Sequence, residues 1–158
     1  MLTRVYIDNF RSFVNFEYRP AKKQLLLGAN GSGKSSLLEA IRYVKLFIAG
    51  EENPFTQLTR TRWQDRPLQV VEIDALLEGQ EYQYRIETRF DSDTRLPSVN
   101  MESLKVSGTT SFDRTNETLR FSMRWTNLLI VERVNRTLNW ATFPVGTDTY
   151  FKANPLTT

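Results

Sequence analysis

The chain of 158 residues contains no cysteine and no histidine. Without cysteine it can form neither disulfides nor thiolate metal sites, and without histidine it lacks the commonest acid–base residue and zinc ligand. No apolar run approaches the roughly 18 residues of a transmembrane helix, and the start MLTRVYIDNF lacks the apolar core of a signal peptide. We therefore expect a cytoplasmic protein that makes no contact with a membrane.

The composition is that of one soluble globular domain. Hydrophobic residues make up 40% of the chain and charged residues 25%, and both fractions are ordinary for such a domain. The main interpretation of the net charge of +3 is a solvated surface. A contribution to binding phosphates or nucleic acid is the secondary interpretation.

Hydrophobic patterning predicts strands at the start of the chain, followed by a helix. Alternation over 2–8, with Leu2, Val5 and Ile7 as inward positions, and over 13–18, with Val14, Phe16 and Tyr18, predicts a hairpin. The continuous apolar run Leu25–Leu27 predicts a strand that is buried on both faces. From Lys34 apolar residues recur at helical spacing, and Gly50 is the expected stop.

The rest of the chain is expected to be mainly β-structure. After a loop at 51–66, alternation predicts a second hairpin of strands 71–77 and 82–90 around a turn at 78–81. The further predictions are a linker at 91–100, strands at 103–106, 109–113 and 118–125, a helix over 128–141 or a buried strand at 128–131, and a polar, partly disordered tail at 144–158.

One motif points directly to chemistry. Residues 28–35, Gly-Ala-Asn-Gly-Ser-Gly-Lys-Ser, fit the phosphate-binding pattern G-x-x-x-x-G-K-[ST]. Its glycines leave backbone N–H groups free to face phosphate oxygens, and the following helix adds its positive end. In this pattern Lys34, the candidate catalytic residue, binds the β- and γ-phosphates, Ser35 ligates Mg²⁺ and Ser36 reaches the α-phosphate. The predicted site binds a nucleoside triphosphate.

A hydrolase with this loop also needs an acidic residue at the end of a second strand, to hold Mg²⁺ and activate water. The segment Val70–Asp74 is interrupted by Glu72 and falls within the second predicted hairpin. The run Leu128–Glu132 fits better, but no Asp precedes Glu132, and a solvated Glu after a core element explains it equally well.

The opening segment and the loop resemble the N-terminal part of ABC-type ATPases of the SMC, RecF and OLD group, and most closely the RecF-like AAA-type ATPases of bacteria. VYIDNFRSF, residues 5–13, resembles that group's I-x-N-F-R/K-S-F start. LGANGSGKSSLLEAI, residues 27–41, resembles its G-x-N-G-S/A-G-K-S-x-L-L-E-A-I stretch. The likeness is specific over 1–48 and looser over 70–125.

The resemblance implies ATP and Mg²⁺ as cofactors, a cytoplasmic setting, and DNA as a partner in repair, chromosome maintenance or antiphage defence. It places Arg11 and Ser12 beside the phosphates and base, although a solvated turn explains Arg11 equally well. The residues implied to hold the nucleotide are Arg11, Ser12, Gly28, Asn30, Gly31, Ser32, Gly33, Lys34, Ser35 and Ser36, with Ser35 as the metal ligand.

Parts that this group needs for hydrolysis are not evident in the chain. No L-S-G-G-like signature occurs, since Val106-Ser107-Gly108 is followed by Thr109. Nothing in the sequence selects the glutamine of the so-called Q-loop among Gln57, Gln64, Gln69, Gln80 and Gln83. We therefore expect the first lobe of a longer ATPase, which binds ATP but hydrolyses it only with a second lobe and a dimer partner.

The expected fold class is α/β: the first lobe of a P-loop ATPase, with a mixed sheet, a buried helix and an antiparallel β-layer. One partial ATPase domain is expected over 1–158, with the hairpin, loop strand and helix in 1–50, the β-layer in 70–125, and a helix and tail in 126–158.

Two other readings stay open. A small P-loop kinase would use the same loop, although such kinases start almost directly with the loop strand and continue with helices. A nucleic-acid-binding β-module would use the basic residues Arg85, Arg89, Arg120 and Arg124 near aromatics, unless these merely form a solvated sheet face.

Overall fold

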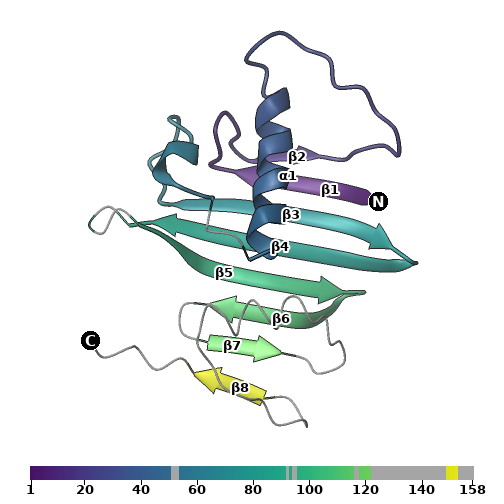
Figure 1. The fold of residues 1–158 in the computed structure, drawn as a ribbon, viewed down its shortest axis with the longest axis vertical. Helices are drawn as coiled ribbons and strands as arrows, with labels where there is room; N and C mark the ends of the chain where they lie inside the picture. The colour runs from purple at the N-terminus through teal and green to yellow at the C-terminus, as the bar shows by residue number, and fades with distance from the viewer. Residues whose placement is uncertain (51–53, 92, 94–95, 116–117, 122–148, 153–158) are drawn as a thin grey trace.

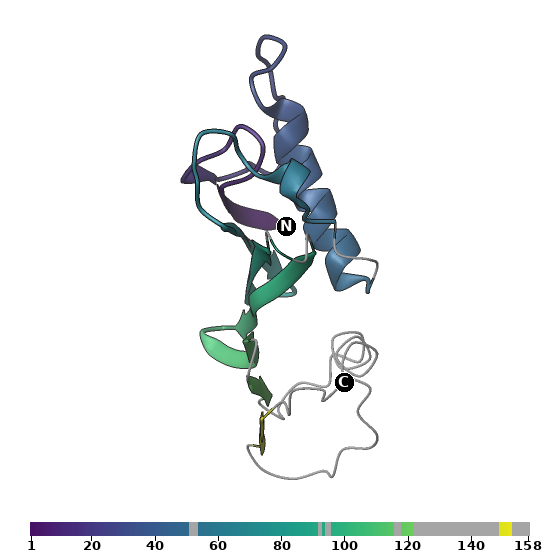
Figure 2. The ribbon, with the colours of Figure 1, turned by 90° about the vertical axis from the view of Figure 1, so that its left-hand side faces the viewer.

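The computed structural model describes residues 1–50, 54–91, 93, 96–115, 118–121 and 149–152. In this part of the chain one α-helix lies on one face of an eight-stranded sheet (Figures 1 and 2). The strand order is β2-β1-β3-β4-β5-β6-β7-β8, and all neighbours are antiparallel. The elements are β1 (Leu2–Asp8), β2 (Phe16–Tyr18), α1 (Lys34–Ile48), the 3₁₀-helix η1 (Gln57–Thr59), β3 (Leu68–Leu77), β4 (Gln80–Phe90), β5 (Pro97–Val106), β6 (Thr109–Thr115), β7 (Thr118–Phe121) and β8 (Thr149–Lys152).

Two tight turns fix the register of the central strands. Glu78 and Gly79 both have positive φ, 51° and 80°, and they join β3 to β4 with Leu77 opposite Gln80. Ser107 and Gly108 do the same between β5 and β6. Two-residue turns with positive φ at both positions match the right-handed twist of antiparallel strands. Both predicted hairpins, at the N-terminus and over 71–90, are confirmed.

The helix α1 packs its apolar stripe against the sheet. Leu37, Ala40, Val44 and Phe47 are buried, and the chain turns away after Ala49 at Gly50, whose φ is 81°. Figure 2 shows α1 on one side of the sheet, with the segment that precedes it at the upper end. The predicted helix and its stop at Gly50 are confirmed. The core consists of Val5, Ile7, Phe10, Phe13, Leu37, Ala40, Val44, Phe47, Phe55, Val71, Tyr84, Ile86, Leu104, Val106 and Phe112.

The predicted strand at Leu25–Leu27 is wrong. These residues adopt no regular structure, and the side chains of Leu25 and Leu27 are 77% and 81% exposed. A strand that is buried on both faces needs neighbouring strands and covering layers, and the described part of the chain provides none here. The described sheet is therefore antiparallel throughout, not mixed as predicted.

Smaller differences have local causes. β2 begins at Phe16, so Val14 lies in the preceding turn and is exposed. Leu2 is only partly buried, because an irregularity between Leu2 and Arg4 breaks the alternation of β1. The linker is shorter than expected, since β5 already starts at Pro97.

The C-terminal predictions are tested only in part. β8 pairs with β7 inside the segment 144–158 that we expected to be a tail. The predicted helix or strand over 128–141, the end of the predicted strand at 122–125 and the candidate acid Glu132 lie outside the described residues. In the described part, no helix has both the length and the hydrophobicity to cross a membrane.

The aromatic cluster of Phe10, Tyr43 and Phe55 ties the first turn to α1 and to the following loop. Phe10 is fully buried, and its ring meets Tyr43 and Phe55 edge-on at centroid distances of 5.8 and 6.1 Å. We expect Phe10→Ala to lower the free energy of unfolding by about 3–5 kcal/mol, since it removes a fully buried ring. Urea denaturation measures this, and Leu77→Ala, at an exposed position, is the control. Equal effects of the two changes would contradict the assigned core.

Candidate functional site

The glycine-rich loop, residues 28–33, leads directly into the first turn of α1. Gly31 and Gly33 have φ of 82° and 93°, which L-residues with a side chain rarely adopt. The N–H of Ser32 bonds to the carbonyl of Ala29 at 3.2 Å and closes a turn within the loop. Gly33 is the N-cap residue, no side chain caps the helix, and its first turn carries no acidic residue. The first-turn N–H groups therefore remain available to an anion.

Lys34 folds back over the loop that precedes it. Its Nζ donates to the carbonyls of Gly28 and Ala29 at 2.7 and 2.8 Å and to the Ser32 hydroxyl at 3.3 Å. A Cβ at residue 28 would lie 2.7 Å from Ser32 Oγ, so a larger residue there would displace the Ser32 hydroxyl. The motif lysine thus lies within the loop, although the loop strand is absent.

The first hairpin turn touches the glycine-rich loop. A Cβ at residue 33 would lie 3.0 Å from Cζ of Phe13 and 3.4 Å from the hydroxyl oxygen of Ser12. Two segments about 20 residues apart in the sequence thus meet at the N-terminus of α1. Ser12 therefore lies next to the loop, and its contact with a nucleotide stays a prediction.

Arg11 is bound to the helix instead of lying free in the turn. Its Nε and Nη2 donate to the two carboxylate oxygens of Glu39 at 3.1 and 2.9 Å, and its backbone N–H donates to the Thr59 carbonyl at 2.7 Å. Arg11 is nevertheless an exposed residue of the turn, so its place beside a nucleotide stays a prediction. Glu39 lies one turn beyond Ser35 on α1, so this ion pair is close to the start of the helix.

The remaining candidates occupy the loop and the first turn of α1. Asn30 and Ser35 are exposed, and Ser36 is half-buried. Their placement alone does not distinguish their roles, so their contacts with a nucleotide and with Mg²⁺ stay predictions. Among the described residues, no group of three or more Asp and Glu side chains could hold a metal by itself.

The sequence did not reveal that Asn9 holds the neighbouring loop. Asn9 is fully buried with φ of 56°. Its side-chain amide donates to the carbonyls of Arg66 and Leu68, both at 2.7 Å, and accepts from the N–H of Thr61 at 3.3 Å. The signal that could have found it is residue type, since Asn tolerates positive φ and can bond backbone groups in turns.

The structure distinguishes some of the glutamines. Gln69 is buried, and its amide is used at both ends, by the Asn9 carbonyl and the Thr59 hydroxyl, so it has a structural role. Gln64 donates to Asp8 at 3.3 Å, but its Oε1 is buried without a partner. Gln80 accepts from the Tyr82 hydroxyl at the β3–β4 turn.

Ion pairs on the sheet weaken the hypothesis that the chain is a nucleic-acid-binding β-module. Arg85 bonds to Glu72 and Glu87, and Arg4 bonds to Glu17 and to Glu72. These side chains lie on the face away from α1, and carboxylates neutralise Arg4 and Arg85 there, whereas Arg89 is exposed. Arg124 lies outside the described residues, and nothing is described of the side chain of Arg120.

The contact at Gly33 gives a stability prediction. We expect Gly33→Ala to lower the free energy of unfolding by about 1 kcal/mol or more. The new methyl group would meet the Phe13 ring, and the alanine would have to adopt a positive φ. Gly50→Ala is the matched control, since it has a similar φ but no atom within 4 Å of the added Cβ. Urea denaturation compares the two, and an equal loss would mean that the Phe13 contact is unimportant.

The Arg11–Glu39 pair gives a pH prediction. Hydrogen bonds from Arg11 hold the pKa of Glu39 below its ordinary value of 4.5. Because folding lowers this pKa, the pair stabilises the protein above pH 4.5, and the stabilisation is lost as the pH falls through the folded-state pKa. At pH 7 we expect Glu39→Gln to destabilise by about 1 kcal/mol or less.

The difference between wild type and Glu39→Gln should shrink when denaturation is repeated at lower pH. Glu81→Gln makes the same charge change at an exposed position and serves as the control. A difference that stays constant with pH would show that the ionised pair does not stabilise the fold.

Residues 4–142 match the family model described as an AAA domain, which is most of the chain. No curated protein matches. Two solved structures of the recombination mediator protein RecF in the RecFOR pathway, RecF-ATPrS and RecF-ATP, are each 22% identical and are matched over 70% of this chain, with TM-scores of 0.49 and 0.47.

The chain spans only 27% and 28% of the chains in those two structures. The family match, in contrast, extends from β1 through the glycine-rich loop and α1 into the later strands. The chain therefore belongs to the AAA domain family, and its predicted resemblance to ATPases of the SMC, RecF and OLD group is confirmed.

Proposed function

We propose that this chain is the ATP-binding lobe of a RecF-like ABC-type ATPase. It binds Mg-ATP through residues 28–36 at the N-terminus of α1. Hydrolysis requires a second lobe and a dimer partner, because the sequence contains neither a convincing acidic strand nor a signature segment. By resemblance, the complete protein acts on DNA, in repair or antiphage defence.

The position of Lys34 is the observation that carries this proposal. Its ammonium group is bound by two carbonyls and a hydroxyl of its own loop. A polyphosphate offers stronger, charged acceptors at the same place, so the ammonium can exchange these neutral partners for the β- and γ-phosphates. The uncapped N–H groups of α1 then point at the same anion.

The residues around the loop fit Mg-ATP. The loop has glycines with positive φ at 31 and 33 and leaves open space at Gly31, where a Cβ would meet nothing within 4 Å. Ser35 supplies a hydroxyl for Mg²⁺, and the remaining ligands are phosphate oxygens and water, as is usual for this ion. Arg11 and Ser12 approach the nucleotide from the first turn. Arg11 does so either after its ion pair with Glu39 breaks or while that pair is kept.

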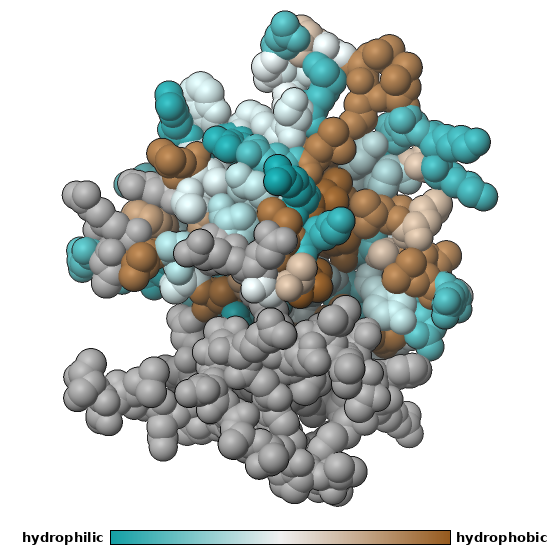
Figure 3. Space-filling model, viewed as in Figure 1, coloured by the Kyte–Doolittle hydropathy of each residue, from teal (hydrophilic) through white to brown (hydrophobic). Residues whose placement is uncertain are grey.

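An apolar segment that pairs with no strand in the described part of the chain supports the need for a second lobe. Leu25 and Leu27 precede the loop and are exposed, and Leu38 on the first part of α1 is exposed as well. Figure 3 shows hydrophobic surface, in brown, on the face that carries α1. Docking of a second lobe would give 25–27 the neighbouring strands that a doubly buried strand needs.

Mg-ATP titration of the wild type and of Lys34→Ala tests the proposal. We expect the substitution to weaken binding by about tenfold or more, since charge-assisted bonds to phosphate contribute roughly 1.5–3 kcal/mol. Lys45→Ala, at the other end of the same helix, is the matched control and should bind as the wild type does. Equal binding by wild type and Lys34→Ala would refute the assignment.

Turnover recorded in the same samples separates the lobe from the alternatives. We expect negligible phosphate release by the isolated chain. Transfer of labelled phosphate to a small acceptor at ordinary rates would favour the P-loop kinase, and binding to nucleic acid that falls steeply with salt would favour the β-module.

A further inference from the structure

The glycine-rich loop contains an asparagine that is followed directly by glycine. Asn30 and Gly31 form the one Asn-Gly pair of the sequence, since every other asparagine is followed by a residue with a side chain. Both residues are exposed, and they lie in the segment beyond the upper end of α1 in Figures 1 and 2. Asparagine is among the thermolabile residues of proteins, and it loses its side-chain amide most readily when glycine follows.

Few contacts hold this pair in the described part of the chain. The Asn30 side chain forms no hydrogen bond with a described residue, and neither does the backbone N–H of Gly31. A Cβ at position 31 would meet no atom within 4 Å. One backbone bond closes around the pair, from the N–H of Ser32 to the carbonyl of Ala29, and its 3.2 Å is at the long end of the usual range. A single bond of this kind adds little net stability, so the loop can open and let the Gly31 nitrogen approach the Asn30 side chain.

This freedom allows the two residues to react with each other. The backbone nitrogen of Gly31 gives up its proton to solvent and attacks Cγ of Asn30, and the new N–Cγ bond closes a cyclic imide. The Cγ–Nδ2 bond breaks, and the amide nitrogen takes a proton from solvent and leaves as ammonia. Water then opens the imide at either carbonyl and leaves aspartate or isoaspartate at position 30. Water is the one co-reactant, and glycine at position 31 has no side chain to hinder the attack.

The charge at this end of α1 favours a carboxylate at position 30. The N-terminus of the helix is partly positive, and its first turn carries no acidic residue. The ammonium group of Lys34 bonds to the carbonyls of Gly28 and Ala29, directly before the pair. We assign the nucleotide phosphates to this same positive environment. A carboxylate here competes with them for Lys34 and repels them.

We propose that Asn30 is a self-modification site that inactivates the glycine-rich loop. Loss of its amide places a negative charge where the phosphates would bind. The reaction itself depends only on Asn30 and Gly31, whereas the inactivation rests on the proposed ATP site. Bound Mg-ATP protects the pair, because the phosphates occupy the backbone N–H groups of the loop and hold it closed.

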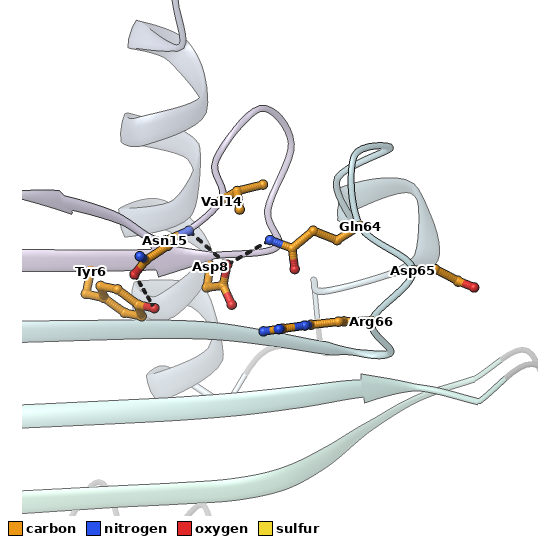
Figure 4. Close-up of a pocket in the computed structure, with 7 residues that line it drawn as sticks. All are labelled: Tyr6, Asp8, Val14, Asn15, Gln64, Asp65 and Arg66. Atoms are coloured by element: carbon orange, nitrogen blue, oxygen red, sulfur yellow. Dashed lines mark hydrogen bonds between the residues drawn. The ribbon is translucent and has the colours of Figure 1, made fainter.

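Asn15 is a control within the same chain. It is also exposed, with a positive φ of 48°, but the side chain of Phe16 follows it. Its Oδ1 accepts from the Tyr6 hydroxyl at 3.1 Å, and its backbone N–H donates to Asp8 at 2.9 Å. Figure 4 shows both bonds in the wall of a pocket beside β1. We therefore expect Asn15 to keep its amide.

Peptide mass spectrometry of the purified chain, incubated at physiological temperature and pH, tests the modification. We expect conversion of amide to acid at position 30, none at position 15, and its loss in Gly31→Ala, where the added methyl group hinders the nitrogen. Asn30→Gln should also keep its amide, because its longer side chain must close a larger ring. Absence of conversion at position 30, or conversion that continues unchanged in Gly31→Ala, would overturn the proposal.

The same incubation with Mg-ATP tests the protection. We expect slower conversion of Asn30 when the nucleotide is present. Conversion at one rate with and without Mg-ATP would refute the protection and count against the proposed ATP site, and it would leave the modification itself established.

Asn30→Asp supplies the charge of the product directly. We expect it to weaken Mg-ATP binding by about tenfold or more, because like charges a few ångströms apart repel each other. Asn15→Asp makes the same charge change outside the glycine-rich loop and should bind as the wild type does. Equal binding by the wild type and Asn30→Asp would refute the inactivation. If the wild type itself does not bind Mg-ATP, the proposed function fails, and mass spectrometry alone decides the modification.

Discussion

The contact between Phe13 and Gly33 holds the candidate site together. The glycine-rich loop lies at the free end of α1, and the described residues provide no strand beneath it. Its position is set by two things: the apolar stripe of α1 on the sheet, and the ring of Phe13 against a residue that has no side chain. A larger residue at 33 would push the loop away from Ser12. The close packing of protein interiors makes such an approach sensitive to one methyl group.

The polar groups near the site form two separate layers. On the α1 side, Arg11 connects the first turn to Glu39 and, through its backbone, to Thr59. On the opposite face, Asp8, Asn15 and Gln64 are linked by hydrogen bonds and leave acceptors free. Asn9 lies between them, and its amide fixes the loop that carries Gln64 and Arg66. The same short turn after β1 therefore contacts the glycine-rich loop on one side and lines the pocket at Asp8 on the other.

The local structure was largely predictable from the sequence, because short-range physics determines it. The alternation in β1, β3 and β4, the glycine-containing turns, the helical spacing from Lys34 and the stop at Gly50 all appear as expected. The predicted strand at Leu25–Leu27 was wrong because it depends on long-range contacts and not on short-range physics. An apolar run indicates burial, but whether it forms a strand depends on neighbours that lie elsewhere.

The sequence by itself determined the glycine-rich loop, its helix and the family to which the chain belongs, since these depend on residues close together in the chain. Only the tertiary structure decided that Arg11 pairs with Glu39, that Ser12 reaches Gly33, and that Asp8, Gln64 and Arg66 line one pocket. Such contacts join segments some 20 to 60 residues apart, and their formation depends on how the antiparallel strands and α1 pack, because loop closure by itself favours no particular partner.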